Sequence, residues 1–246
     1  MNFTLLAFDT IDSTNTEALK QARQGGAEGL CVVARRQTAG RGRHGRTWAS
    51  ARDAGLYLSI VFRPTLEPRF LPLITLMSGV AVHDTLVEFG VRPDIKWVND
   101  VLVDEKKISG ILAETTDTAH GLAVIVGIGI NITSGNFPPE ISNTATSIQE
   151  STGKAVPPDS LAAALTKYLS YFYEILKGEN GPATIIEEWR RRSSYYSGKL
   201  VQVAIGNDAI RGVTDGLESN GALRVKAANG STSIIQAGDV QRLRAE

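Results

Sequence analysis

Residues 37–48 read Gln-Thr-Ala-Gly-Arg-Gly-Arg-His-Gly-Arg-Thr-Trp, so glycines at 40, 42 and 45 alternate with arginines at 41, 43 and 46. No acidic residue occurs between Glu28 and Asp53. Glycine lets a loop turn its N–H groups inward, and guanidinium groups pair with phosphate or carboxylate oxygens. The stretch predicts an anion-binding loop, with a solvated, flexible basic loop as the alternative. Its spacing is not that of a Walker loop, and no helix signal follows it, as a dinucleotide-binding motif would require.

The composition argues against several classes of protein. The 246 residues include 26 Lys+Arg and 26 Asp+Glu, whereas nucleic-acid-binding proteins usually carry a basic surplus. The single cysteine, Cys31, excludes an internal disulfide, and its apolar neighbours predict a buried strand residue rather than a nucleophile. The N-terminus lacks the basic segment of a signal peptide, and the apolar run 122–130 is too short to cross a bilayer. These features predict a cytoplasmic protein without a membrane span.

Hydrophobic periodicity predicts an α+β body followed by a small all-β unit. Thr14 and Glu17 have capping-box spacing, and the strand 56–62 is expected to bury one face. After Gly198, about five short strands separated by turn residues predict a small barrel. We therefore expect domains at 1–197 and 198–246. The other expected elements are strands at 3–8, 30–34, 94–98, 101–103, 108–115 and 121–131, and helices at 15–24, 73–89, 159–177 and 183–192.

Three further motifs contain residues suited to binding or catalysis. Lys96-Trp-Val-Asn-Asp100 places a cation, an amide and an acid near a strand end, although a surface turn with a buried Trp is equally consistent with it. Lys107-Ile-Ser-Gly-Ile-Leu-Ala-Glu114 and Gly127-Ile-Gly-Ile-Asn131 contain glycines inside strands, which often mark close approach of a ligand. The alternatives are a solvated strand-end lysine and close helix packing. The three histidines show no metal-ligand spacing, and no nucleophile set is suggested.

Together with Ser13-Thr-Asn15, these motifs resemble those of biotin protein ligases in order and spacing, over nearly the whole chain. The resemblance implies a class II synthetase-like catalytic domain with a mixed sheet flanked by helices, and an SH3-like C-terminal barrel. It implies that ATP and biotin form biotinyl-5′-adenylate, with Mg²⁺ on the ATP phosphates. Biotin then passes to a lysine of a biotin carboxyl carrier domain of a carboxylase. Lipoate or octanoate transfer is the main alternative, and a non-enzymatic anion- or nucleic-acid-binding module is another.

The resemblance also implies a role for each matched residue. Arg43 is expected to be the catalytic cation, Lys107 to contact the biotin carboxylate, and Asp100 to assist the incoming acceptor lysine. The metal ligands are unknown, with Asn99 as one neighbour of the metal. The implied biotin-binding residues are Ser13, Thr14, Asn15, Gln37, Gly40, Arg41, Arg43, Lys107, Gly110, Gly127 and Gly129. The implied ATP-binding residues are Arg43, Arg46, Trp48, Lys96, Asn99, Asn131 and Arg244, with Arg242 as the alternative to the last.

Three residues depart from the family pattern. Val98 replaces a proline, His44 stands where arginine is common, and Asp239 replaces a glutamate. The chain begins almost at the catalytic motifs, so we expect a ligase without the family's DNA-binding domain and no DNA partner. Specific operator binding in a gel shift would contradict that expectation. A homodimer through the main sheet is expected from family analogy.

Overall fold

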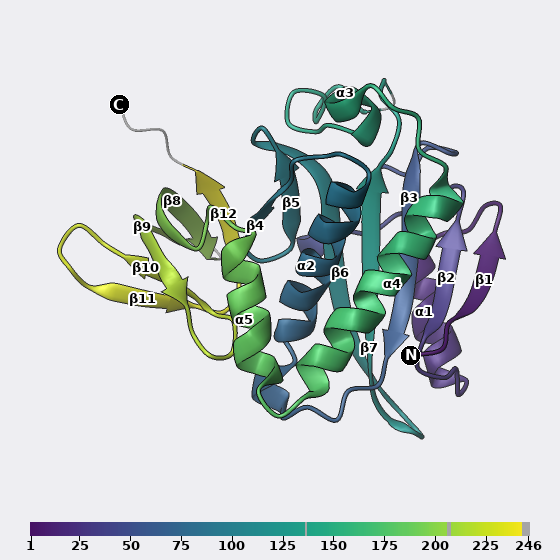
Figure 1. Ribbon diagram of the computed structural model, residues 1–246, viewed down its shortest axis with the longest axis horizontal. Helices are drawn as coiled ribbons and strands as arrows, with labels where there is room; N and C mark the ends of the chain where they lie inside the picture. The colour runs from purple at the N-terminus through teal and green to yellow at the C-terminus, as the bar shows by residue number, and fades with distance from the viewer. Residues whose placement is uncertain (136, 206–207, 243–246) are drawn as a thin grey trace.

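The structure, a computed structural model, describes residues 1–135, 137–205 and 208–242. Its larger sheet has seven strands in the order β1-β2-β3-β7-β6-β5-β4 (Figure 1). β1 and β2 are parallel, and the other neighbouring pairs are antiparallel. The expected mixed sheet is therefore confirmed. Its strands are β1 (Thr4–Phe8), β2 (Leu30–Ala34), β3 (Gly55–Phe62), β4 (Asp94–Lys96), β5 (Asp100–Val103), β6 (Lys106–Thr118) and β7 (Gly121–Asn131).

Helices cover both faces of this sheet, which confirms the α+β class (Figure 1). α1 (Thr14–Arg23) lies on one face, and α2 (Leu73–Glu88), α4 (Pro158–Lys177) and α5 (Gly181–Arg191) lie on the other. β3 is buried on both faces, because Leu58 packs into the large core and Val61 packs with the α1 cluster. The expectation that this strand buries only one face was wrong. The larger apolar residues of β3 alternate with smaller or polar ones in the sequence. That pattern does not show that α1 covers the second face of the strand.

α2 is the central helix of the core. The segment Pro68–Glu88 is long and apolar enough to cross a membrane by length and composition, but 61% of its most apolar window is buried inside the fold. α2 packs against α4, α5 and β6, so its apolar surface is used within the domain. A single turn of 3₁₀ helix occurs at Pro68–Phe70, whereas the turn at Arg43–Gly45 is not helical, because His44 has a φ of 54°.

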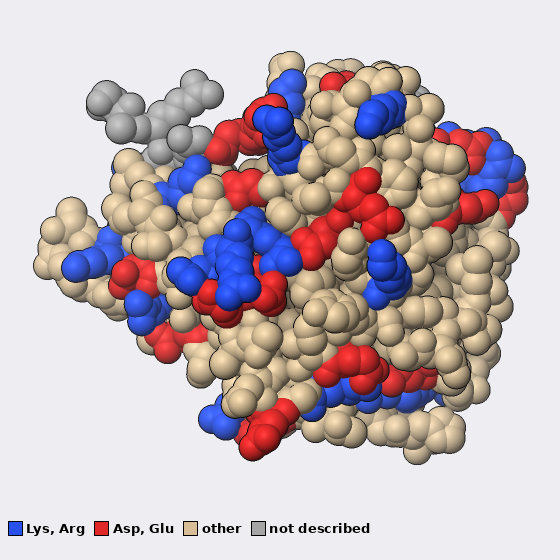
Figure 2. All heavy atoms as spheres, in the orientation of Figure 1, with Lys and Arg blue, Asp and Glu red and all other residues tan. Residues whose placement is uncertain are grey.

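The exposed side of α5 mixes charges of both signs. Glu187 pairs with Arg190 at 2.6 Å, and Arg192 pairs with Asp84 of α2 at 2.6 Å. Figure 2 shows acidic and basic side chains next to one another across this helical face. Trp189, by contrast, is completely buried, so the segment is more than the solvated charged face that its sequence suggests. This face lacks the single-sign basic surface typical of nucleic-acid-binding modules.

The C-terminal residues form a separate five-stranded antiparallel sheet in the order β11-β10-β9-β8-β12, beside α5 and β4 (Figure 1). The Trp97 indole, just after β4, donates a 2.9 Å hydrogen bond to Gly221 O, which joins the two sheets. About five short strands were expected here, and five are described. The SH3-like barrel and the domain boundary at 197/198 remain predictions. The strands are β8 (Ser197–Ile205), β9 (Asp208–Leu217), β10 (Leu223–Lys226), β11 (Thr232–Ile235) and β12 (Asp239–Arg242).

α3 (Ile148–Thr152) was not predicted from the sequence. Ser147 caps it by accepting a hydrogen bond from Glu150 N–H, at 3.2 Å. A helix of five residues is too short to show the 3.6-residue periodicity on which helix prediction depends.

Candidate active site

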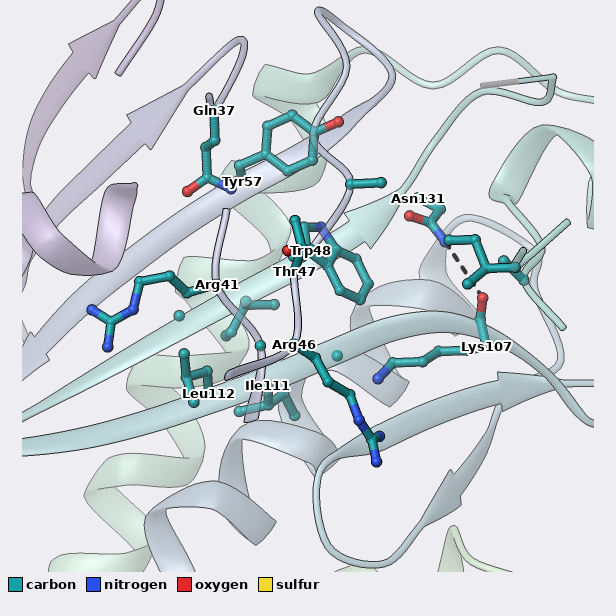
Figure 3. Close-up of a pocket in the computed structure, with 18 of the residues that line it drawn as sticks. Gln37, Arg41, Arg46, Thr47, Trp48, Tyr57, Lys107, Ile111, Leu112 and Asn131 are labelled. Carbon is teal, nitrogen blue, oxygen red and sulfur yellow. Dashed lines mark hydrogen bonds between the residues drawn. The ribbon is translucent and has the colours of Figure 1, made fainter. Parts of the chain in front are cut away.

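A pocket of about 280 Å³ lies on the α1 face of the main sheet. Its walls come from the start of α1, from β6 and β7, from residues 37–48 and from the start of β12. Figure 3 shows the Trp48 indole in the middle of this pocket, with Gln37 on one side and Lys107 on the other. The structure brings most of the expected site residues together here. Those that line the pocket are Thr14, Asn15, Gln37, Arg41, Arg43, Arg46, Trp48, Asn99, Asp100, Lys107, Gly110, Gly127, Gly129 and Asn131.

Four expected site residues lie elsewhere or cannot be placed. Ser13 and Gly40 are not among the described residues that line the pocket. Lys96 lines an adjoining polar pocket of about 140 Å³, which shares Arg43, Asp100 and Asp239 with the first. Arg244 lies outside the described residues, as does the side chain of its alternative, Arg242.

The start of α1 differs from the expected capping box. Ser13 is the N-cap residue, and its side chain makes no capping hydrogen bond. Thr14 is already helical, and its hydroxyl instead contacts Gln37 Oε1 at 3.1 Å. The capping-box interpretation was therefore wrong, because the threonine hydroxyl is used across the pocket rather than along the helix.

Residues 40–48 form a hairpin that positions the three arginines. Trp48 N–H donates to Gly40 O at 2.9 Å, and Gly42 N–H donates to Arg46 O at 2.7 Å. The two tip residues, His44 and Gly45, both have positive φ, 54° and 72°. Such a two-residue turn matches the twist of paired strands, and histidine is among the non-glycine residues that adopt this conformation most readily.

One end of the pocket, which we call the amide end (Thr14, Asn15 and Gln37), is held by hydrogen bonds. Gln37 Oε1 accepts from Thr14 N–H at 2.8 Å, and Gln37 Nε2 donates to Ser50 Oγ at 2.8 Å. Asn15 Nδ2 donates to Glu114 Oε2 at 2.9 Å. Because each amide has partners on both its oxygen and its nitrogen, the orientation of each side chain is determined by its neighbours.

The opposite end, which we call the cationic end (Arg43, Arg46, Lys96 and Lys107), is held by ion pairs. Asp100 Oδ1 lies 2.5 Å from Lys107 Nζ, and its Oδ2 lies 3.1 Å from Lys96 Nζ. Burial raises the pKa of Asp100, but the two ammonium groups outweigh burial and hold that pKa below its ordinary value. Asp100 is therefore a carboxylate at neutral pH.

The two arginines of the cationic end contact the C-terminal sheet. Arg43 donates to Asn99 Oδ1 at 2.8 Å and reaches Gly238 O at 3.4 Å. Arg46 pairs closely with Asp239, the first residue of β12, whose carboxylate also lies 3.8 Å from Arg43. The C-terminal sheet thus supplies part of the site.

Three glycines make room for protein side chains in this structure. A Cβ at Gly127 would collide with Asn15 Oδ1, and one at Gly129 would collide with the Trp48 indole. At Gly110 it would lie 2.9 Å from the same indole. Biotin contact at these glycines, which the sequence suggested, stays a prediction. Trp48 Nε1 is buried and has no hydrogen-bond partner among the described residues, so it can donate to a ligand.

Two family patterns match this chain. Residues 7–131 match the biotin/lipoate A/B protein ligase family, and residues 196–243 match the biotin protein ligase C terminal domain. The biotin--[acetyl-CoA-carboxylase] ligase of Mycobacterium tuberculosis is 32% identical over 94% of this chain and 86% of that protein. The chain belongs to the biotin/lipoate A/B protein ligase family. The resemblance drawn from the motifs is thereby confirmed.

Solved structures place this family member among biotin protein ligases in fold. The biotin protein ligase of Aquifex aeolicus, in complex with biotin and ATP, is 30% identical and superposes with a TM-score of 0.84 over 98% of this chain and 99% of that one. The Leishmania major enzyme in complex with biotinyl-5-AMP is 26% identical, with a TM-score of 0.68 over 96% of this chain and 100% of that one. The match to the bifunctional ligase/repressor of Bacillus spizizenii spans only 48% of that protein's length.

Sequence reasoning missed two acidic contributors to this family member's site. Glu114 binds both Asn15 and Arg41, and Asp239 binds Arg46. Glu114 ends a motif that was noticed, but its two contacts depend on how α1 and the hairpin fold over β6. Asp239 drew attention only as a departure from a family pattern, because a contact across almost two hundred residues has no local signal.

Cys31 is not suited to act as a nucleophile, and the described part of this ligase-family chain contains no protein-built metal cage. Burial raises the pKa of the Cys31 thiol to about 12, so the thiolate needed for attack is not formed. The described residues contain no cluster of three His, Cys, Asp or Glu side chains that could hold a metal ion. A magnesium ion carried mainly by nucleotide phosphates does not require such a cage.

Proposed function

We propose that this chain is an ATP-dependent biotin protein ligase. It would form biotinyl-5′-adenylate and transfer biotin to a lysine of a biotin carboxyl carrier domain. The observation that carries the proposal is the division of one pocket into an uncharged amide end and a cationic end. The pocket's two ends match the two ends of biotin, which has a neutral ureido ring and an anionic carboxylate.

The pocket favours one orientation of biotin. The ureido group both donates and accepts hydrogen bonds, which suits the Thr14 hydroxyl and the Gln37 amide at this end. Leu112, an apolar residue of β6, also lines the pocket, whereas the Ile111 side chain packs in the large core near Gly79 of α2. The carboxylate then points toward Arg43 and Lys107, where fixed cations offset its charge.

In the first half-reaction, a carboxylate oxygen of biotin attacks the α-phosphorus of ATP, and the bond to the leaving pyrophosphate breaks. Two anions must approach each other, and charge then grows on the phosphoryl oxygens. Arg43 and Arg46 stabilise that charge, and their hairpin and ion-pair contacts hold them in place before reaction. A bound magnesium ion would neutralise phosphate charge, and the side-chain oxygens of Asn99 and Asp239, which line the adjoining polar pocket, would help to hold it.

In the second half-reaction, the amine of the acceptor lysine attacks the mixed anhydride. An amide bond forms, the bond to AMP breaks, and the amine loses a proton. Because the pKa of Asp100 is lowered, it is a weak base toward an ammonium group whose ordinary pKa is about 10.4. We therefore assign Asp100 to attracting and orienting the acceptor ammonium, with proton loss to solvent.

The acceptor follows from the names of the relatives. The Mycobacterium tuberculosis and Paracoccus denitrificans proteins are both named biotin--[acetyl-CoA-carboxylase] ligases, so a carboxylase carrier domain is the proposed partner. The cytoplasm is the proposed location. A homodimer through the main sheet is a further prediction, which sedimentation analysis would test.

Mass spectrometry of an acceptor domain tests the proposal. The domain is incubated with this protein, ATP and Mg²⁺, with biotin and lipoate supplied separately. A biotin-sized adduct is expected, and Arg43→Ala and Lys107→Ala should abolish it. Arg69→Ala and Lys167→Ala, which change exposed surface residues, are the matched controls. A lipoyl adduct would overturn the substrate, and the absence of both an adduct and pyrophosphate release would overturn the proposed reaction.

A further inference from the structure

Ser59, in the middle of β3, lies behind the wall of the pocket. Its side chain is completely buried, and it is not among the described residues that line the pocket. Ser59 Oγ lies 2.6 Å from Asn15 Oδ1 and 2.8 Å from Thr14 Oγ1. Asn15 and Thr14 both line the pocket. One hydroxyl therefore contacts two of the three amide-end side chains without being exposed to the ligand space.

The partners of Asn15 determine the direction of these hydrogen bonds. Asn15 Nδ2 donates to Glu114 Oε2 at 2.9 Å and to a main-chain carbonyl of β6 at 3.3 Å, and both of these groups only accept. Asn15 Oδ1 therefore faces Ser59, which must donate its single proton to it. Toward Thr14, the Ser59 oxygen can then only accept. The Thr14 proton is directed into the protein, to Ser59 or to Gln37 Oε1 at 3.1 Å.

We propose that Ser59 is a positioning residue that makes the amide end select for a ligand N–H donor. With its proton directed inward, Thr14 keeps an oxygen lone pair for the pocket and so presents an acceptor. A ureido group supplies two N–H donors, whereas the dithiolane ring of lipoate supplies none. This inference rests on the proposed function and deepens it, because it explains how an uncharged wall distinguishes biotin from lipoate.

Removing the Ser59 hydroxyl should disturb both neighbours at once. In Ser59→Ala, Asn15 Oδ1 loses its donor, and Thr14 loses the nearer of its two acceptors. A buried polar atom left without a partner typically weakens binding roughly tenfold or more. Ser59→Ala should therefore raise the dissociation constant for biotin by about tenfold.

Calorimetric titration of Ser59→Ala tests the proposal, with Ser78→Ala as the matched control. Ser78 is equally buried, and its hydroxyl donates to Ile74 O at 2.7 Å within α2, away from the pocket. Each protein is titrated with biotin and with the two carbamate analogues, in each of which one ureido N–H is replaced by oxygen. One of the two analogues lacks the N–H group that donates to Thr14 Oγ1. The wild type and Ser59→Ala should bind that analogue with nearly equal affinity.

Two results would overturn the inference. Biotin affinity in Ser59→Ala equal to that of the wild type would do so, as would the same loss for biotin and for both analogues, which indicates a purely structural role. If Ser59→Ala does not fold, the same titrations are made on Ser59→Cys, whose weak thiol donor should give a smaller loss with the same ligand dependence. A wild-type protein that does not bind biotin would contradict the proposed function itself.

Discussion

The two ends of the pocket are built by different physical means. At the amide end, Gln37 and Asn15 are held by neutral hydrogen bonds and by one carboxylate, and Asn15 is buried. At the cationic end, Lys107 and Arg46 are held by ion pairs to Asp100 and Asp239, and Arg46 is largely exposed. Neutral hydrogen bonds determine orientation, whereas ion pairs hold charge where another anion can exchange with the carboxylate.

The difference suggests a division of labour. A group that must be recognised is met by side chains that do not rearrange, so the empty site already has the required pattern of donors and acceptors. Groups that must react are met by cations that exchange partners, from the protein's carboxylates to the substrate's carboxylate and phosphates. Changes at the amide end should therefore alter affinity, and changes at the cationic end should alter rate.

The largest effect is expected for Arg43→Ala. Its guanidinium is the cation held by both the Asn99 turn and the C-terminal sheet, where charge develops in adenylation. Loss of one such donor typically lowers the rate about 10²- to 10³-fold, which biotin-dependent pyrophosphate release would measure. A fall in rate of less than about threefold would show that Arg43 is not the catalytic cation. It would also contradict the expectation that changes at the cationic end mainly alter rate.

A smaller effect, on affinity, is expected for Gln37→Ala. This change removes the acceptor for Thr14 N–H at the start of α1. The dissociation constant for biotin should rise about tenfold, because a buried donor is left unpaired. Titration calorimetry gives the affinity, and pyrophosphate release at saturating biotin gives the rate. A greater loss of rate than of affinity would contradict the division between the two ends.

The pH dependence of stability should reveal the Asp100 ion pairs. Because the folded-state pKa of Asp100 is lowered, its contribution to stability is present above an unfolded pKa of about 3.9. It is lost as the pH falls through the lower folded-state pKa. The difference in melting temperature between the wild type and Asp100→Asn should therefore shrink below about pH 4. Asp159→Asn, at an exposed site on α4, is the control, and a difference for Asp100→Asn that widens toward acid would refute the assignment.

The smallest effect is expected for Asp239→Asn. Asp239 holds the exposed Arg46, and an exposed ion pair contributes little, so tryptic cleavage after Arg46 should rise only about two- to fivefold in the ligand-free protein. Asp215→Asn, which breaks an exposed pair with Arg224 in the same sheet, should leave that cleavage rate unchanged. Slower cleavage would mean that Asp239 does not hold the hairpin.

Prediction from sequence succeeded where local patterns decide the structure. The strands 30–34 and 121–131 were predicted with the observed bounds, because runs of apolar residues end there at turn residues. The four predicted helices were placed to within two residues, because their apolar residues recur at helical spacing. Most of the site residues that the family resemblance implied also line the pocket.

What failed depends on contacts between distant segments. The hydroxyl of Thr14 could cap α1 or cross to Gln37, and only the fold decides between them. Asp239 reaches Arg46 because β12 lies beside β8, which brings its first residue over the hairpin. The role of Ser59 could not be predicted from the sequence, because a single serine in an apolar strand does not by itself indicate a function.

The ion pairs at the cationic end have a consequence outside the reaction. Nucleic-acid phosphates bind arginine and lysine side chains without regard to sequence, so an arginine-rich hairpin with unpaired guanidinium groups would attract them. At the cationic end, Asp100 pairs with both lysines and Asp239 pairs with both arginines. Four positive and two negative side chains leave a formal charge of 4 − 2 = +2 there. A polynucleotide would have to displace both carboxylates and would release few counterions in return. The ion pairs thus allow the pocket to bind the phosphates of a nucleotide while weakening non-specific binding of nucleic acids.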